Sequence, residues 1–123
     1  MPLTLRVAEK KPRIFMISLT GALDTSTHML LDDKIDQLVN EGGARIITLD
    51  MSGVHFISSM GVRSAFRAKK ALAKNQGAFL MVNLQPPVKK VFEIIDALPT
   101  MNIFASLQEM DDYLARMQSQ IDD

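Results

Sequence analysis

Two short apolar runs do most to limit what this chain can fold into. Residues 46–49 and 78–82 are almost entirely apolar, which is typical of strands that are covered on both faces. Such strands need a layer of helices packed against them. The segments that follow each run repeat their apolar residues at helical spacing, so the sequence predicts an α/β fold.

The beginning of the chain predicts a hairpin. Residues 3–7 and 15–19 alternate between apolar and polar side chains, which is the period of a half-buried strand. The sequence Glu-Lys-Lys-Pro at residues 9–12 is typical of a turn. We therefore expect the first two strands to pair in antiparallel fashion.

Four helices are predicted from capping signals and apolar spacing. Asp24 or Thr25 can cap the first, which ends at Gly42-Gly43. The second helix is expected to begin at Ser58-Ser59 and to end at Gly77, and the third to begin at Pro86-Pro87 and to end at Pro99. A capping box formed by Ser106 and Glu109 marks the start of the fourth. The apolar sides of the four helices are Leu31, Ile35, Leu38 and Val39; Val62, Ala65, Phe66 and Leu72; Val88, Val91, Phe92 and Ile95; and Leu107, Met110, Leu114, Met117 and Ile121.

A short strand around Met101, Ile103 and Phe104 completes the order strand, strand, helix, strand, helix, strand, helix, strand, helix. Right-handed crossovers would make the later strands parallel. We expect a mixed, mostly parallel sheet of about five strands, with an N-terminal β-hairpin and about four helices. At 123 residues, this is expected to be a single domain over residues 1–123.

Composition argues against several classes of function. Fourteen basic and fourteen acidic residues cancel, which disfavours nucleic-acid binding. The chain has no cysteine and only two separated histidines, His28 and His55, so no metal site and no cofactor are expected. No segment reaches the roughly 20 apolar residues that span a bilayer, and the N-terminus lacks a signal-peptide pattern. We expect a soluble, cytoplasmic protein without direct membrane insertion.

The sequence also lacks the usual parts of an enzyme. No glycine-rich phosphate loop is present, and no histidine is placed to activate a serine nucleophile. His55 falls in the expected strand-to-helix connection. Asp50 is expected to end a central strand, as the phosphorylated Asp of a receiver domain does. A receiver domain needs an acidic pair after its first strand, and that pair is missing here.

The adjacent serines Ser58 and Ser59 lie where a helix is expected to begin. A helix N-terminus holds phosphate well, so the pair is a candidate switch; alternatively, one serine only caps the helix. A basic stripe follows on the same helix, which is either a solvated face or a partner contact. It consists of Arg63, Arg67, Lys70 and Lys74.

Three segments together resemble a known family. They are the Gly-Ala-Leu-Asp sequence of residues 21–24, the strand at residues 46–50, and above all residues 52–63, Ser-Gly-Val-His-Phe-Ile-Ser-Ser-Met-Gly-Val-Arg. In this order they are similar to the anti-sigma factor antagonist family, the STAS domain. The resemblance extends from about Leu3 to Leu114.

The resemblance implies a small, non-enzymatic switch module. The family's Asp-Ser-x-Gly element implies that Ser59 accepts phosphate, and the adjacent Ser58 is the alternative acceptor. Ser58 stands where the family has Asp, so this chain lacks a negative charge beside the acceptor. The implied partners are an anti-sigma factor acting as a serine kinase and a PP2C-type phosphatase; a weak homodimer is also allowed. The implied partner-binding residues are Asp24, Thr25, Ser58, Met60, Gly61 and Arg63.

A second interpretation stays open at this point. The chain could be a constitutive STAS scaffold or adaptor in a larger complex, for lipid transport or stress signalling, in which the serine pair only caps the helix. Nucleotide binding, suggested for some relatives of the family, is a third alternative.

Overall fold

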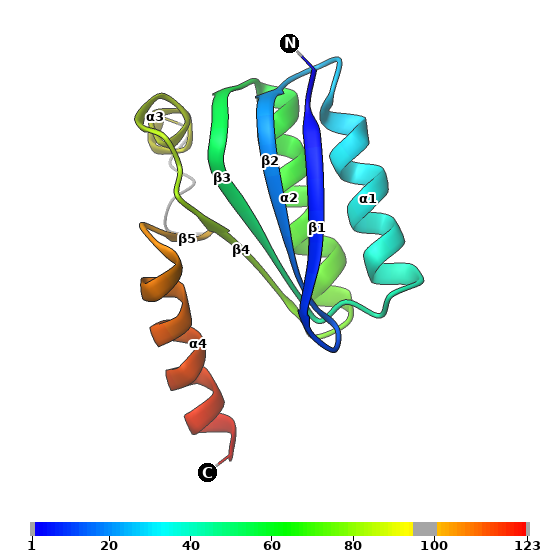
Figure 1. The fold of residues 1–123 in the computed structure, drawn as a ribbon, viewed down its shortest axis with the longest axis vertical. Coiled ribbons are helices and arrows are strands. Elements are labelled where there is room, and N and C mark those ends of the chain that lie inside the picture. Colours follow the sequence, from blue (N-terminus) through cyan, green and yellow to red (C-terminus); the bar gives the residue numbers. More distant parts are fainter. Residues whose placement is uncertain (1, 95–100, 123) are drawn as a thin grey trace.

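The elements follow one another in the predicted order. The computed structural model describes residues 2–94 and 101–122, the last six of these by backbone only (Figure 1). Its elements are β1 (Thr4–Lys11), β2 (Ile14–Leu23), α1 (His28–Asn40), β3 (Ile46–Ile57), α2 (Ser59–Lys74), β4 (Ala78–Val82), α3 (Pro86–Ile94), β5 (Asn102–Phe104) and α4 (Leu107–Asp122).

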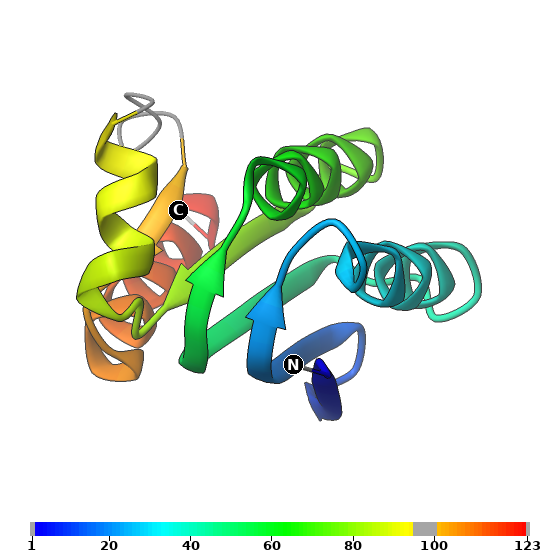
Figure 2. The ribbon, with the colours of Figure 1, turned by 90° about the horizontal axis from the view of Figure 1, so that it is seen from above.

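The strands form one five-stranded sheet in the order β1-β2-β3-β4-β5. β1 and β2 are antiparallel, and every later pair is parallel. Helices α1 and α2 lie side by side on one face of the sheet, and α4 lies on the other (Figure 2). The predicted mixed α/β fold with an N-terminal hairpin is confirmed.

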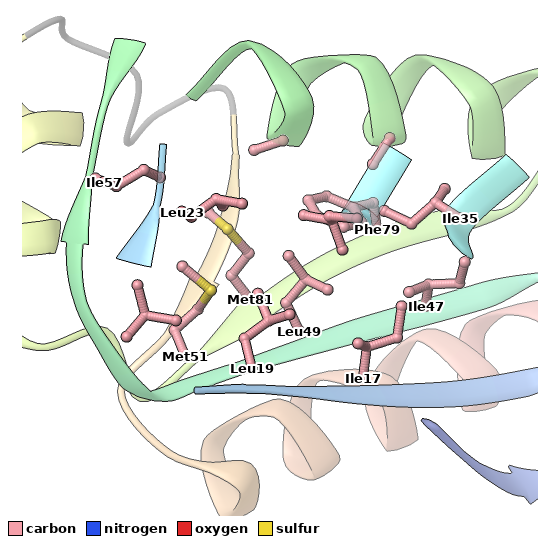
Figure 3. Close-up of a cluster of buried hydrophobic side chains, with 14 of the residues drawn as sticks. Ile17, Leu19, Leu23, Ile35, Ile47, Leu49, Met51, Ile57, Phe79 and Met81 are labelled. Carbon is pink, nitrogen blue, oxygen red and sulfur yellow. The ribbon is translucent and has the colours of Figure 1, made fainter. Parts of the chain in front are cut away.

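Alternating side chains of the central strands form the main core. Ile17, Leu19, Leu49 and Met81 point toward α1 and α2, where they pack in one cluster (Figure 3). The opposite face of β4 contributes to a smaller cluster with α4, whose buried members are Leu80, Val82, Phe104 and Met110. β4 is therefore covered on both faces, as its unbroken apolar sequence predicts.

The hairpin is longer than the sequence suggests. The predicted turn at residues 9–12 starts too early, because Glu9 pairs with Phe15 and Lys11 with Ile14 as part of β1, and only Pro12 of that run lies in the turn. The chain reverses one residue later, where Arg13 adopts a φ of 68°. Its backbone N–H donates to the Glu9 carboxylate at 3.1 Å, which stabilises this tighter reversal.

Strand β3 is also longer than predicted, since it continues to Ile57 instead of ending near Asp50. The extension pairs with the end of β2, where Leu23 lies opposite Ile57. Gly53 permits this close pairing, because a Cβ there would lie 2.6 Å from the carbonyl oxygen of Leu19. His55 is consequently an exposed strand residue, and its expected place in a connection is wrong.

The helix signals are partly confirmed. Ser106 accepts a hydrogen bond from the N–H of Glu109 at 3.2 Å, as the capping box predicts. Phe66 was expected to be buried, yet it is 38% exposed. Gln76, with a φ of 58°, takes the left-handed conformation after α2. Ile95 and Pro99 lie outside the described residues, as do the side chains of Met117 and Ile121.

Candidate functional site

Two strand-to-helix junctions meet at one end of the sheet. β2 and β3 are parallel, so the chain leaves both strands at the same edge, near the top of Figure 1. The N–H of Ser58 donates to the carbonyl oxygen of Leu23 at 3.0 Å. A Cβ added to Gly61 would lie 2.6 Å from the same oxygen. The start of α2 therefore rests on the end of β2, directly beside the loop that begins at Asp24.

The adjacent serines at the start of α2 occupy different environments. Ser58 is the N-cap, and its Oγ accepts a hydrogen bond from the N–H of Gly61 at 3.4 Å, while its carbonyl accepts one from Val62 at 3.0 Å. Ser59 is the first helical residue and is exposed. Within the described part of the chain, its hydroxyl has no hydrogen-bond partner. One serine is used by the fold, and the next is accessible to an enzyme or a partner.

The Asp24 carboxylate organises the first junction. Its Oδ1 accepts hydrogen bonds from the Ser26 hydroxyl at 2.9 Å, the Ser26 N–H at 3.0 Å and the Thr27 N–H at 3.1 Å. The bond from the Ser26 hydroxyl is the main cause that lowers the pKa of Asp24 below its usual value of 3.8, and the Thr27 bonds add to it. The carboxylate therefore stays ionised, and its hydrogen bonds to Ser26 and Thr27 hold the loop closed.

The N-cap of α1 differs from the sequence prediction, which placed it at Asp24 or Thr25. The cap is Thr27, and its buried hydroxyl donates to the Ala22 carbonyl at 2.8 Å and accepts from the Asp24 N–H at 2.9 Å. Asp24 already uses its carboxylate inside the loop, so the helix begins only after that loop closes. Thr25 is exposed at the loop's outer side.

The remaining predicted site residues lie on the first turns of α2. Met60 is half-buried, Gly61 is buried and Arg63 is exposed. In residues 2–94 and 101–122 no acidic side chain pairs with Arg63. Arg63 is one helical turn beyond Ser59, so the two side chains share a face of α2.

A polar cluster between α1 and α2 was not expected from the sequence. The His28 Nδ1 lies 3.0 Å from Asp32 Oδ2 and 3.4 Å from the buried Ser64 hydroxyl. Arg67 donates to Asp36 at 2.7 Å, and this bond raises the pKa of the guanidinium. Acidic residues four apart on the preceding helix were the signal for this pairing, because they share one helix face.

Asp50 does not have the surroundings of a receiver-domain acceptor. It lies inside β3 instead of at its end. Burial alone would raise the pKa of this carboxyl, but hydrogen bonds from the Ser52 N–H and the Asn83 side chain lower it. Among the described residues, no group of three His, Cys, Asp or Glu side chains could hold a metal ion.

None of the helices in the described residues is long and apolar enough to cross a membrane. The longest, α2 and α4, have 16 residues each and carry charged side chains along their length.

These observations define a small α/β protein in which an exposed serine begins a helix at the end of a parallel sheet. The family model described as the STAS domain matches residues 6–110, and the chain therefore belongs to the STAS domain family. The family resemblance predicted from the sequence is confirmed.

Individual relatives agree with this assignment. BtrV of Bordetella bronchiseptica, named as a candidate anti-sigma factor antagonist, is 30% identical over 86 residues, which cover 70% of this chain and 73% of BtrV. An anti-sigma factor antagonist structure from Mycobacterium paratuberculosis has a TM-score of 0.77 at 22% identity and 94% coverage of both chains. Unphosphorylated SpoIIAA has a TM-score of 0.72 at 19% identity, over 92% of this chain and 98% of that chain. At these identities the solved structures show a shared fold.

Proposed function

We propose that this protein is a cytoplasmic interaction module controlled by phosphorylation of Ser59. In its unphosphorylated form it binds an anti-sigma factor that also acts as a serine kinase. Phosphorylation releases that partner, and a PP2C-type phosphatase resets the module. The observation that carries the proposal is the different use of two neighbouring hydroxyls, because Ser58 caps α2 while Ser59 stays exposed beside it.

The helix start can accept a phosphate without disturbing the fold. A phosphoserine carries about −1.5 to −2 charges and three strong acceptor oxygens. At the first position of α2 it would face the positive end of the helix dipole, which stabilises an anion by roughly 0.3–1 kcal/mol. Because the Ser59 side chain is not packed in the core, nothing has to move to make room for the added group.

A docked partner would respond differently to the same phosphate. It would meet a bulky dianion within a surface that fits a small hydroxyl. A loss of about 3 kcal/mol in binding free energy corresponds to an affinity change of roughly a hundredfold. The modification can therefore switch the interface while the module stays folded. SpoIIAA, which shares the fold, has been solved in its phosphorylated form with a TM-score of 0.70 to this chain.

The surface that we propose for the partner surrounds Ser59 at the two junctions. Gly61 is buried, so its part is to let α2 approach β2 closely, and the other residues supply the contacts. The proposed set is Asp24, Thr25, Ser58, Met60, Gly61 and Arg63. Ser58, the neighbouring hydroxyl, is the alternative phosphorylation site, and it stands where the family carries an acidic residue.

The test begins with capture of partners from the native cell, using tagged wild-type protein, Ser59→Ala and Ser59→Asp side by side. We expect wild type and Ser59→Ala to retain a kinase that Ser59→Asp loses. Incubating the recovered kinase with ATP should add one phosphate to the wild type, measured by intact mass, and none to Ser59→Ala. Phosphate that persists in Ser59→Ala would move the modification to another hydroxyl, and Ser58 is the first candidate.

The scaffold alternative gives the opposite result in the same experiment. If the serines only cap the helix, Ser59→Asp recovers the same partners as wild type in the same amounts. That outcome would refute the phosphorylation switch and leave the protein as a constitutive adaptor.

A further inference from the structure

The outer face of α2 continues the proposed surface away from Ser59. Arg63, Phe66 and Lys70 follow Ser59 at intervals of four, three and four residues, so all of them lie on one face of the helix. Each of these side chains is exposed, including the aromatic ring of Phe66 at 38%. We name the set of Arg63, Phe66 and Lys70 the α2 stripe.

Within the part of the chain that the structure describes, the two cations of the α2 stripe have no acidic partner. Arg67 points toward α1 and bonds to Asp36 at 2.7 Å, with the charges of Asp32 and Asp33 also close to it. In the described residues, Arg63 and Lys70 take part in no ion pair. The stripe therefore presents two available cations on either side of an exposed aromatic ring.

We infer that the α2 stripe binds an acidic protein surface on the partner that recognises unphosphorylated Ser59. This inference rests on the proposed function and names the chemistry of its partner. Two cations flanking a ring match an acidic helix or loop with an apolar residue between its carboxylates. Phenylalanine and arginine are also among the residue types that are enriched at protein interfaces relative to the rest of the surface.

The neighbouring helix argues against a broad anionic ligand. The acidic side chains Asp32, Asp33 and Asp36 of α1 lie alongside α2, close enough to act on Arg67. A membrane surface or a nucleic-acid duplex that covered the α2 stripe would also bring its phosphates against these carboxylates. A narrow acidic segment of a protein avoids that repulsion. The net charge of zero for the whole chain agrees with this restriction.

This geometry explains how one phosphate can release such a partner. A phosphate on Ser59 lies one helical turn from Arg63, within reach of a charge-assisted hydrogen bond. The bond would remove one of the two cations from the partner's reach, and the remaining negative charge would repel the partner's carboxylates. The α2 stripe thus links the modification to the electrostatics of docking.

The test uses the partner protein that wild type captures and Ser59→Asp does not. This partner is purified, and its affinity for wild type and for variants of the α2 stripe is measured by titration. We expect Lys70→Glu and Phe66→Ala each to weaken binding about tenfold at low salt, and Lys70→Arg to restore it. Lys10→Glu, an exposed substitution on β1, is the matched control and should leave binding unchanged. The effect of Lys70→Glu should shrink as salt rises, because screening weakens exposed charges. Circular dichroism confirms that each variant is folded.

Three results would overturn this inference. If Ser59→Asp abolishes binding while Lys70→Glu and Phe66→Ala bind like wild type, the proposed switch survives and the α2 stripe is not its docking surface. A second contrary result concerns other ligands. If Lys70→Glu loses a wild-type affinity for phosphatidylserine vesicles or duplex DNA but still binds the captured protein, the stripe serves a lipid or nucleic acid. If capture finds no protein sensitive to Ser59→Asp, the switch and the docking surface both fail.

Discussion

The two junctions at the end of the sheet connect parallel strands to helices in opposite ways. Between β2 and α1 the chain uses four residues, and the side chains of Asp24 and Thr27 bind each other, Ser26 and the Ala22 carbonyl. Between β3 and α2 it uses one residue, Ser58, whose side chain makes a single long hydrogen bond of 3.4 Å. The first junction is closed by its own side chains, and the second leaves a hydroxyl exposed at Ser59.

This difference separates the residues that hold the site in place from Ser59, the residue that the proposed function modifies. The Asp24 loop is held in place by these bonds, so in the proposed function it would present a fixed surface. The Ser58 junction is short, and its next residue has no structural duty in the described residues. Gly61 joins the two, because it allows α2 to lie against the backbone of Leu23. Variants at each position can therefore test whether support and switching are separate.

The largest effect on stability is expected from Gly61→Ala, which disturbs the contact between the junctions. Inside a helix, alanine is normally favoured over glycine by about 1 kcal/mol. Here the added Cβ would lie 2.6 Å from both the Leu23 carbonyl oxygen and a carbon of Ile57. Overpacking of this kind costs about 1–3 kcal/mol, and since one clash is with backbone, we expect a net loss of about 2 kcal/mol in urea denaturation. A stability equal to or above that of wild type would show that α2 can move away freely.

A smaller loss is expected from Thr27→Val, which tests the closed junction. Valine keeps the shape of threonine but removes the hydroxyl that binds the Ala22 carbonyl and the Asp24 N–H. The Ala22 carbonyl would be left unpaired in a buried site and the Asp24 N–H in a partly buried one. An unpaired buried group costs about 1–3 kcal/mol, and we expect a loss of about 1.5 kcal/mol. Thr25→Val, at the exposed neighbour, is the control and should change stability by less than about 0.5 kcal/mol. Equal effects of the two would contradict the role given to Thr27.

The sequence predicted the order of elements because apolar spacing and caps are local signals. Residues 46–49 and 78–82 indicated buried central strands, and Ser106 with Glu109 indicated the start of α4. What it missed depends on partners distant in the chain. β3 continues to Ile57 only because β2 runs beside it, and the cap moves to Thr27 because Asp24 closes the loop first.

The same limit applies to the candidate site. Its residues were found from a local motif, and their spacing along α2 determined which of them share a helix face. Local spacing also predicted a buried Phe66 and a uniform basic stripe. The packing of α1 decides otherwise, because Asp36 removes Arg67 from the stripe and the ring of Phe66 falls outside the contact with the sheet. Those outcomes need the position of a second element, which periodicity does not supply.

The third prediction sharpens the contrast between the two serines. Ser58→Ala removes the cap of α2, which usually costs about 0.5–2 kcal/mol; the 3.4 Å bond places the expected loss near 0.5–1 kcal/mol. Ser59→Ala removes an exposed hydroxyl without a partner in the described residues, so its stability should lie within about 0.5 kcal/mol of wild type. Thermal melting of both variants measures the difference. A reversed order would mean that Ser59 supports the helix and Ser58 is the spare hydroxyl.

The smallest effect is expected from acid, and it acts on the closed junction alone. The lowered pKa of Asp24 means that its carboxylate stabilises the folded state at pH values above 3.8, and that this contribution is lost as the pH falls through the lower, folded-state pKa. Asp24→Asn has no such proton to bind, so its stability should fall less than that of wild type over the same acid range. Asp50 also has a lowered pKa, but its contribution is common to both proteins and cancels in the comparison. Urea denaturation of both proteins at pH 5 and pH 3 measures the difference. An equal loss of stability in wild type and Asp24→Asn would contradict a stabilising Asp24 carboxylate. The Ser58 junction has no ionisable group of its own, so a phosphate on Ser59 would give it its first pH-dependent charge.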